Sequence, residues 1–254
     1  HVTREGLDDP SVLASTGGAR DARARGKSWN LALASGPADA KAMRSAWKFA
    51  GAMAEIGTPE IEVGAESAMK AALGLPADRP VVVYCPAPRG KGAQRRLMDF
   101  DDWNTALGHE SYLVVCTSDD VEVPTRLRSA VRLVTSDPAP FAAAADIVIS
   151  DYGHGVSWAI AADKRLLLFQ PDQAQYVLRE HGLYTDVEHL APVSSAQGEL
   201  HLQVRDILVG DRQERFAQAR ADFAAEWCGG SRGRVAAQQA ADAILTASGR
   251  GGHR

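Results

Sequence analysis

Short, unbroken runs of apolar residues recur along the chain and predict buried strands. Five of them show no useful alternation of apolar and polar positions: 81–84, 113–115, 131–134, 147–149 and 166–169. Runs of this length and texture are typical of strands that are covered on both faces of a parallel sheet. A further strand is expected at 29–34.

Segments with helical spacing alternate with these runs, as at 95–107 and 156–162. This alternation of strand and helix predicts an α/β fold with an open parallel sheet and right-handed crossovers. The same spacing predicts further helices at 38–56, 65–73, 211–227 and 234–247. Because the sequence Gly-Thr-Pro-Glu at 57–60 breaks the chain and Pro76 follows soon after, we expect a domain boundary between them.

The composition narrows the class of protein without identifying a function. The chain has 254 residues, 45% of them hydrophobic, which is enough to bury a sizeable core. Its 28 Lys and Arg against 32 Asp and Glu give a net charge of -4, which argues against a dedicated nucleic-acid binder. Three widely separated cysteines form no CxxC pair and indicate a reducing compartment. No apolar run approaches the length of a membrane span.

The stretch 144–160, AADIVISDYGHGVSWAI, carries the most chemical information. Gly153 and Gly155 let the backbone approach a ligand, and a helix beginning near Val156 would direct its positive end toward an anion. Asp151 is a candidate acceptor for a ligand hydroxyl, and His154 a candidate phosphate donor or proton-transfer group. The structural alternative is that Asp151 only caps the helix and His154 is an exposed loop histidine.

Three other stretches carry candidate ligand-binding residues, each with a structural alternative. In the loop at 84–91, Arg89 is positioned to form a bidentate pair with a phosphate, unless the loop is only rigid and solvated. Asp172 lies in a polar, aromatic-rich segment that suits a sugar or polyol, or that is simply a surface helix. Ser231, as an N-cap, and Arg232 suggest an anion-binding nest or a flexible joint between helices. The chain has no P-loop, GxGxxG, HExxH or GxSxG motif.

Taken in order, these stretches resemble the CDP-glycerol glycerophosphotransferase family of teichoic-acid and capsule polymerases. The family run LYAPTWR is matched at 83–89, and aDilITDYSSv is matched at 145–152 with the following helix and strand. The motif Y…RG.Y is matched by Tyr176 and 180–184, and HGTPLK..G, which holds the family's proposed catalytic base, lines up with 1–6. The resemblance covers nearly the whole chain.

This resemblance implies the two-lobed GT-B architecture and a division into three parts. Residues 1–75 would be the end of the N-terminal acceptor lobe with a linker, 76–210 the Rossmann-like donor-binding lobe, and 211–254 C-terminal helices with a tail. The implied function is bacterial, metal-independent transfer of a glycerol-phosphate unit from CDP-glycerol to a cell-wall or capsule polymer. CDP-glycerol is then a substrate, no cofactor is required, and no nucleic acid is a partner. The acceptor would be lipid-linked, at the cytoplasmic face of the plasma membrane.

In that mechanism the resemblance makes His1 the base, with Asp151 and His154 as further catalytic residues. The donor would be bound by a second group: Arg89, Tyr152, Gly153, Gly155, Asp172, Ser231 and Arg232. The chain departs from the family pattern at several positions. A motif R.HP is absent after 113–115, the two serines of DYSS are Gly153 and His154, and a later aspartate is Trp158. Two alternatives therefore stay open: a non-catalytic GT-B module, and a nucleotide-sugar glycosyltransferase.

Overall fold

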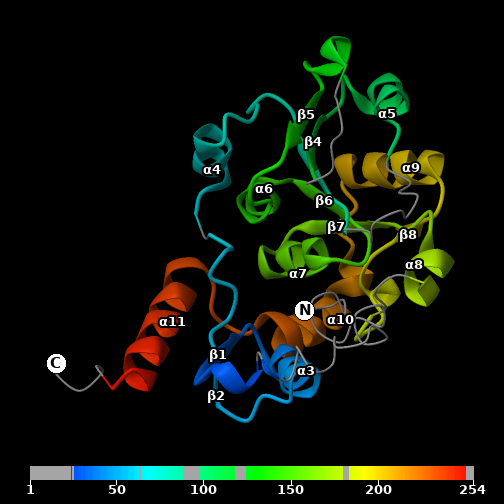
Figure 1. Cartoon of the computed structure of the whole chain (residues 1–254). Helices are drawn as coiled ribbons and strands as arrows, with labels where there is room; N and C mark the ends of the chain where they lie inside the picture. The colour runs from blue at the N-terminus through cyan, green and yellow to red at the C-terminus, as the bar shows by residue number, and fades with distance from the viewer. Residues whose placement is uncertain are drawn as a thin grey trace. The chain divides into compact units, whose positions relative to one another are not determined.

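The computed structural model describes residues 24, 26–62, 64–87, 98–117, 124–179 and 183–249. These residues form two compact units (Figure 1). The first unit takes the described residues within 1–62, 174–185 and 221–254, and the second takes those within 63–173 and 186–220. No helix among the described residues has the length and apolar character needed to cross a membrane.

The second unit is built on a six-stranded sheet in which every pair of neighbouring strands is parallel. The strand order is β5-β4-β3-β6-β7-β8. The strands are β3 (Val81–Cys85), β4 (Tyr112–Cys116), β5 (Val131–Val134), β6 (Ile147–Ser150), β7 (Arg165–Phe169) and the short β8 (Val193–Ser194). The predicted α/β fold with a parallel sheet is confirmed, and all five apolar runs are strands.

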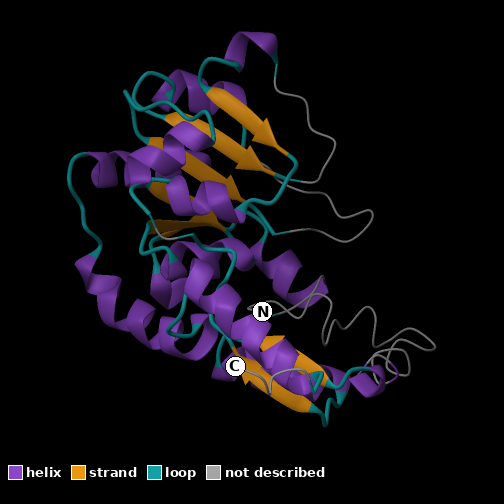
Figure 2. Cartoon of the chain, turned by 90° about the vertical axis from the view of Figure 1, so that its left-hand side faces the viewer, coloured by secondary structure: helices purple, strands orange, loops and turns teal. Residues whose placement is uncertain are grey.

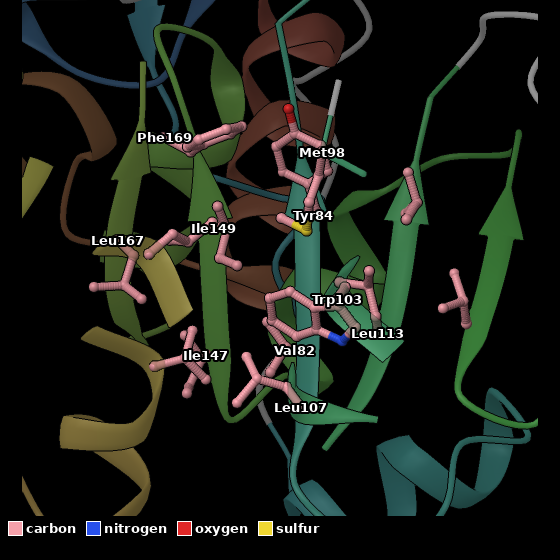
Figure 3. Packing of buried hydrophobic residues seen from close by; sticks show 14 of the residues in the cluster. Val82, Tyr84, Met98, Trp103, Leu107, Leu113, Ile147, Ile149, Leu167 and Phe169 are labelled. Atoms are coloured by element: carbon pink, nitrogen blue, oxygen red, sulfur yellow. The ribbon is translucent and has the colours of Figure 1, made fainter. Parts of the chain in front are cut away.

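Helices cover both faces of this sheet, as Figure 2 shows. On one face α5 (Phe100–Leu107) and α9 (Gln197–Leu208) pack over alternate strand residues such as Val82, Tyr84 and Ile149. Figure 3 shows this core, in which Trp103 of α5 lies among the strand side chains. The opposite face is covered by α6 (Ala139–Ala144) and α7 (His154–Ala161). This double coverage explains why the strands have no polar alternation.

The remaining elements of the second unit are short. They are α4 (Glu66–Ala72), the 3₁₀ turns at Thr125–Leu127, Glu188–Leu190 and Glu214–Phe216, and parts of α8 (Gln173–Arg179) and α10 (Ala217–Phe223). The helix predicted at 65–73 is thus confirmed as α4. Within the helix predicted at 95–107, the described residues contain α5. Asp99 is the N-cap of this helix, and its side chain accepts hydrogen bonds from the amides of Asp101 and Asp102.

The first unit holds a second, two-stranded parallel sheet of β1 (Leu31–Ala34) and β2 (Ala52–Glu55). In the sequence, α3 (Pro37–Trp47) connects these two strands. The helix α11 (Gly233–Ala247) belongs to the same unit. The prediction of a single helix over 38–56 is wrong. The helix ends at Trp47, its C-cap residue Lys48 adopts a left-handed conformation, and Phe49 is buried in the small core beside α3. The following residues pair with β1 instead of continuing the helix.

A cluster of charged side chains joins α4 to the residues that directly precede β6 and β7. The Lys70 ammonium lies 2.7 Å from the Asp146 carboxylate and 2.9 Å from Glu66, while Lys164 lies 2.8 Å from Glu66. Burial by itself would raise the pKa of Glu66, but hydrogen bonds from Lys164 and Lys70 lower that pKa to about 2. The cluster therefore keeps Glu66 ionised in the folded protein at pH values well below the ordinary pKa of a glutamate.

We expect Glu66→Gln to lower the free energy of unfolding by about 0.5–1 kcal/mol at neutral pH, a value kept small because Glu66 is partly exposed. Because the folded pKa lies below the unfolded one, this contribution is complete above the unfolded pKa and is lost as the pH falls toward 2. Urea unfolding of both proteins between pH 7 and pH 3 measures it. The control is Glu199→Gln at an exposed position of α9. A penalty that stays constant down to pH 3 would contradict the assignment.

Candidate active site

The candidate site lies where the order of the strands in the second unit changes direction. From β3 the chain adds β4 and then β5 on one side, and it then returns to place β6 on the other side of β3. Both strands are parallel, so their carboxyl ends, Cys85 and Ser150, lie beside each other. In open α/β sheets such a switch point is where ligands bind, beyond the carboxyl ends of the strands.

A cavity of about 230 Å³ occupies this position. Its walls come from the ends of strands and from the segments that follow them: Cys85, at the end of β3, with Pro86 and Ala87; Cys116, at the end of β4, with Thr117; Thr135, Ser136 and Pro138 after β5; and His154, Gly155 and Trp158 after β6. All of these residues belong to the second unit. The cavity is therefore built by one unit from chain segments that are far apart in sequence.

Asp151 is buried and binds backbone amides, including that of the cavity-lining Ala87. Its Oδ1 accepts hydrogen bonds from the amide of Ala87, at 2.7 Å, and from that of Tyr152, at 2.6 Å. Its own carbonyl accepts a hydrogen bond from the Gln170 side chain. The carboxylate thus joins the segment after β3 to the turn after β6. It does not cap α7, because the N-cap of that helix is Gly153.

Gly153 and Gly155 are required by close packing between the same two segments. A Cβ on Gly153 would lie 2.9 Å from the Ala87 methyl group, and one on Gly155 would lie 2.6 Å from the Ser150 hydroxyl and 2.8 Å from Cβ of Cys85. The Ser150 hydroxyl in turn donates to the Cys85 carbonyl at 2.9 Å. Because neither glycine has a side chain, the start of α7 can sit directly against the end of β3.

His154 is the first residue of α7 and lines the cavity. It is half-buried, so the alternative of an exposed loop histidine is wrong. Its ring stacks on the indole of Trp158, one helical turn later, with 5.8 Å between ring centroids and 27° between planes. The N–H groups of the first turn of a helix have no partners within the helix, and they carry its positive dipole end.

Tyr152 and Asp172 are brought together by the fold. The Tyr152 hydroxyl donates to Oδ1 of Asp172 at 3.3 Å, and Tyr152 is fully buried. This contact links the turn after β6 to the segment after β7. Neither residue lines the cavity among the described residues.

The remaining predicted residues do not lie in the described cavity. His1 and Arg89 lie outside the described residues. Ser231 and Arg232 belong to the first unit, where the Ser231 carbonyl accepts a hydrogen bond from the Thr58 amide at 2.9 Å. The prediction that Ser231 is the N-cap is wrong: Arg232 holds that position before α11, and it makes no side-chain cap hydrogen bond.

Several cavity residues were not predicted from the sequence. Cys85 and Cys116 end neighbouring strands and both line the cavity. A hydrogen bond with Cys116, burial and the nearby charge of Asp151 raise the pKa of the Cys85 thiol well above its ordinary value. The thiol is therefore neutral at physiological pH and contributes no charge. Thr117, Thr135 and Ser136 add hydroxyl groups. Their only signal in the sequence is that they follow predicted strands.

No group of three or more His, Cys, Asp or Glu side chains within the described ranges is arranged to hold a metal ion.

The packing at Gly155 gives a direct test of this geometry. We expect Gly155→Ala to destabilise the protein by about 1–3 kcal/mol, because its Cβ would overlap atoms of Ser150 and Cys85. Gly198→Ala is the matched control, since it also lies near the start of a helix but has no atom within 4 Å of the added Cβ. Thermal unfolding of the two variants measures the difference. Equal stability of both would contradict the close approach of α7 and β3.

Comparisons with known proteins agree with this architecture. The structure of the wall teichoic acid polymerase TagF aligns with a TM-score of 0.77 and 17% identity, over 98% of this chain and 67% of that one. A histidine-to-asparagine variant of TagF soaked with CDPG aligns with a TM-score of 0.72 and 17% identity, over 92% and 61%. This chain thus spans about two thirds of the polymerase chains. At this identity the likeness shows the fold, and it confirms the GT-B-like prediction.

No curated protein sequence matches the chain. In contrast, a family model describing CDP-glycerol:poly(glycerophosphate) glycerophosphotransferases matches residues 3–245, nearly the whole sequence. A match of this extent, on a parallel α/β unit with a cavity at its switch point, assigns the chain to a family: it belongs to the CDP-glycerol:poly(glycerophosphate) glycerophosphotransferases.

Proposed function

We propose that this protein transfers a glycerol-phosphate unit from CDP-glycerol to the terminal hydroxyl of a cell-wall or capsule polymer. The observation that carries the proposal is the cavity at the switch point between β3 and β6, with the start of α7 in its wall, in a chain of this family. A nucleotide diphosphate is the kind of ligand that such a switch point binds.

The start of α7 is the part of the cavity best suited to the diphosphate. His154 and Gly155 both line the cavity within the first turn of the helix. The amides of that turn and the helix dipole favour an anion at this position. The imidazole of His154 adds a hydrogen-bond donor. Arg89, which follows β3 in the sequence, would supply a fixed positive charge.

In the proposed reaction the acceptor hydroxyl attacks the phosphorus atom that carries glycerol. A new oxygen–phosphorus bond forms as the bond from that phosphorus to the CMP oxygen breaks, and CMP leaves with the bonding electron pair. The product is a phosphodiester one glycerol-phosphate longer. His1 would take the proton of the hydroxyl, because a neutral hydroxyl is a weak nucleophile. His154 and the amides of α7 would stabilise the charge on the phosphate oxygens.

Asp151 has a different part in this proposal from the one that the sequence suggested. Its carboxylate is buried and accepts hydrogen bonds from two backbone amides. We therefore treat it as a positioning residue that fixes the start of α7 against the segment after β3. Tyr152 and Asp172, which hydrogen-bond to each other, extend the same support toward β7. The lipid-linked acceptor and a location at the cytoplasmic face of the membrane rest on the family alone.

The proposal predicts release of CMP when the full-length protein is incubated with CDP-glycerol and acceptor. We expect His1→Ala to reduce the rate by about 10²–10⁴-fold, as loss of a general base does. His154→Ala should reduce it by roughly 10- to 100-fold, the effect of losing one hydrogen bond to a charged group. His109→Ala, at an exposed turn after α5, is the matched control.

Three outcomes of this assay would count against the proposal. Release of UDP from a UDP-sugar, without CMP from CDP-glycerol, would identify a nucleotide-sugar glycosyltransferase. Binding of CDP without turnover of any CDP-polyol would identify a non-catalytic module. Full activity in both His1→Ala and His154→Ala would reject the assigned roles.

A further inference from the structure

We propose that His154 and Trp158 form an aromatic wall of the cavity on which the nucleobase of the donor stacks. Both rings line the cavity, and they are stacked on each other with their planes only 27° apart. Residues four positions apart project from the same face of a helix, so both rings reach the cavity from one side of α7. Because the two rings are nearly parallel, a flat ligand ring can extend their stack.

The rest of α7 holds this wall in place. Val156, Ala159 and Ala161 are fully buried, and α7 packs against β6 and β7. Trp158, in contrast, is only half-buried although it belongs to the same short helix. The residue thus presents part of a large aromatic ring to an open cavity instead of to the core. An aromatic ring held in this way on a rigid helix can stack on a flat ligand without first becoming ordered.

The other described walls of the cavity carry groups that suit the edge of a nucleobase. The described lining residues include no Asp, Glu, Lys or Arg. They include three hydroxyl groups, from Thr117, Thr135 and Ser136, and the neutral thiol of Cys85. A nucleobase requires a face to stack on and hydrogen-bonding groups along its edge, and hydroxyls both donate and accept.

The positions of the two rings also fit a nucleotide as a whole. Four residues along an α-helix span about 6 Å, so Trp158 lies about that far along α7 from His154. A ribose would join a base stacked on Trp158 to phosphates at the start of α7, where Gly155 lines the cavity. The inference rests on the proposed function in taking a cytidine nucleotide as the ligand. It adds the side chains that recognise the base.

The test compares binding of CDP and of ribose 5-phosphate, which lacks the base, by calorimetry. We expect Trp158→Ala to weaken CDP binding by about tenfold, the usual effect of losing one base–aromatic stack. Trp158→Phe should keep most of the affinity, and neither substitution should change binding of ribose 5-phosphate. CDP should quench part of the tryptophan fluorescence of the parent protein, and Trp158→Phe should abolish this part while still binding CDP.

Two results would overturn the inference: unchanged CDP affinity in Trp158→Ala, or equal losses for CDP and ribose 5-phosphate, which would indicate a structural role only. These results are separate from the proposed transfer. If the parent releases no CMP but Trp158→Ala selectively loses CDP affinity, the aromatic wall stands and the transfer fails. If CMP is released and Trp158→Ala binds CDP as the parent does, the transfer stands and the wall fails.

Discussion

The buried carboxylate of Asp151 is the interaction on which the candidate site depends. A carboxylate removed from water is costly unless hydrogen bonds replace its hydration. Here the amides of Ala87 and Tyr152 do so, at 2.7 and 2.6 Å. These amides lie after two different strands, so both hydrogen bonds form only when the ends of β3 and β6 have the observed relative position. The requirement to satisfy one charge thereby fixes the two segments that form the switch point.

The glycines make that position sterically possible. Asp151 draws the segment after β3 toward the turn after β6, and Gly153 and Gly155 leave room for Ala87 and Cys85 to approach. The same residues therefore have a structural reason to be present and a place at the cavity. Gly155 lines the cavity, and Asp151 does not. In our proposal Gly155 therefore contacts the ligand, whereas Asp151 holds the residues that contact the ligand in position.

The sequence predicts the sheet well because burial on both faces leaves a local signal. The apolar runs at 81–84 and 147–149 need no knowledge of their neighbours to be recognised as strands. By contrast, the residues of β2 were predicted as helix. They form a strand because they pair with β1, and the paired residues, such as Leu31 and Ala52, are 21 positions apart in the sequence. Short elements such as β8 likewise form through tertiary contacts that override local preference.

The site was predictable in position but only partly in composition. Glycines after a buried strand mark the start of α7, which is local information. The walls contributed by Cys116, Thr135 and Ser136 follow other strands, and only the strand order places them beside His154. Trp158 was visible in the sequence solely as a departure from the family pattern. Its stacking on His154 depends on both residues sharing one helix face.

A fold shared at 17% identity fixes where a ligand binds more firmly than which ligand it is. The switch point follows from strand order, and strand order survives extensive change of sequence. Recognition depends instead on the few side chains that project from that frame into the cavity. In this chain positions 154 and 158 carry two aromatic rings that stack on each other. Because the two rings contact each other, a change at one alters the surface presented by the other. The pair is therefore best understood as a single recognition element, and the selectivity of this protein for its donor should be sought there.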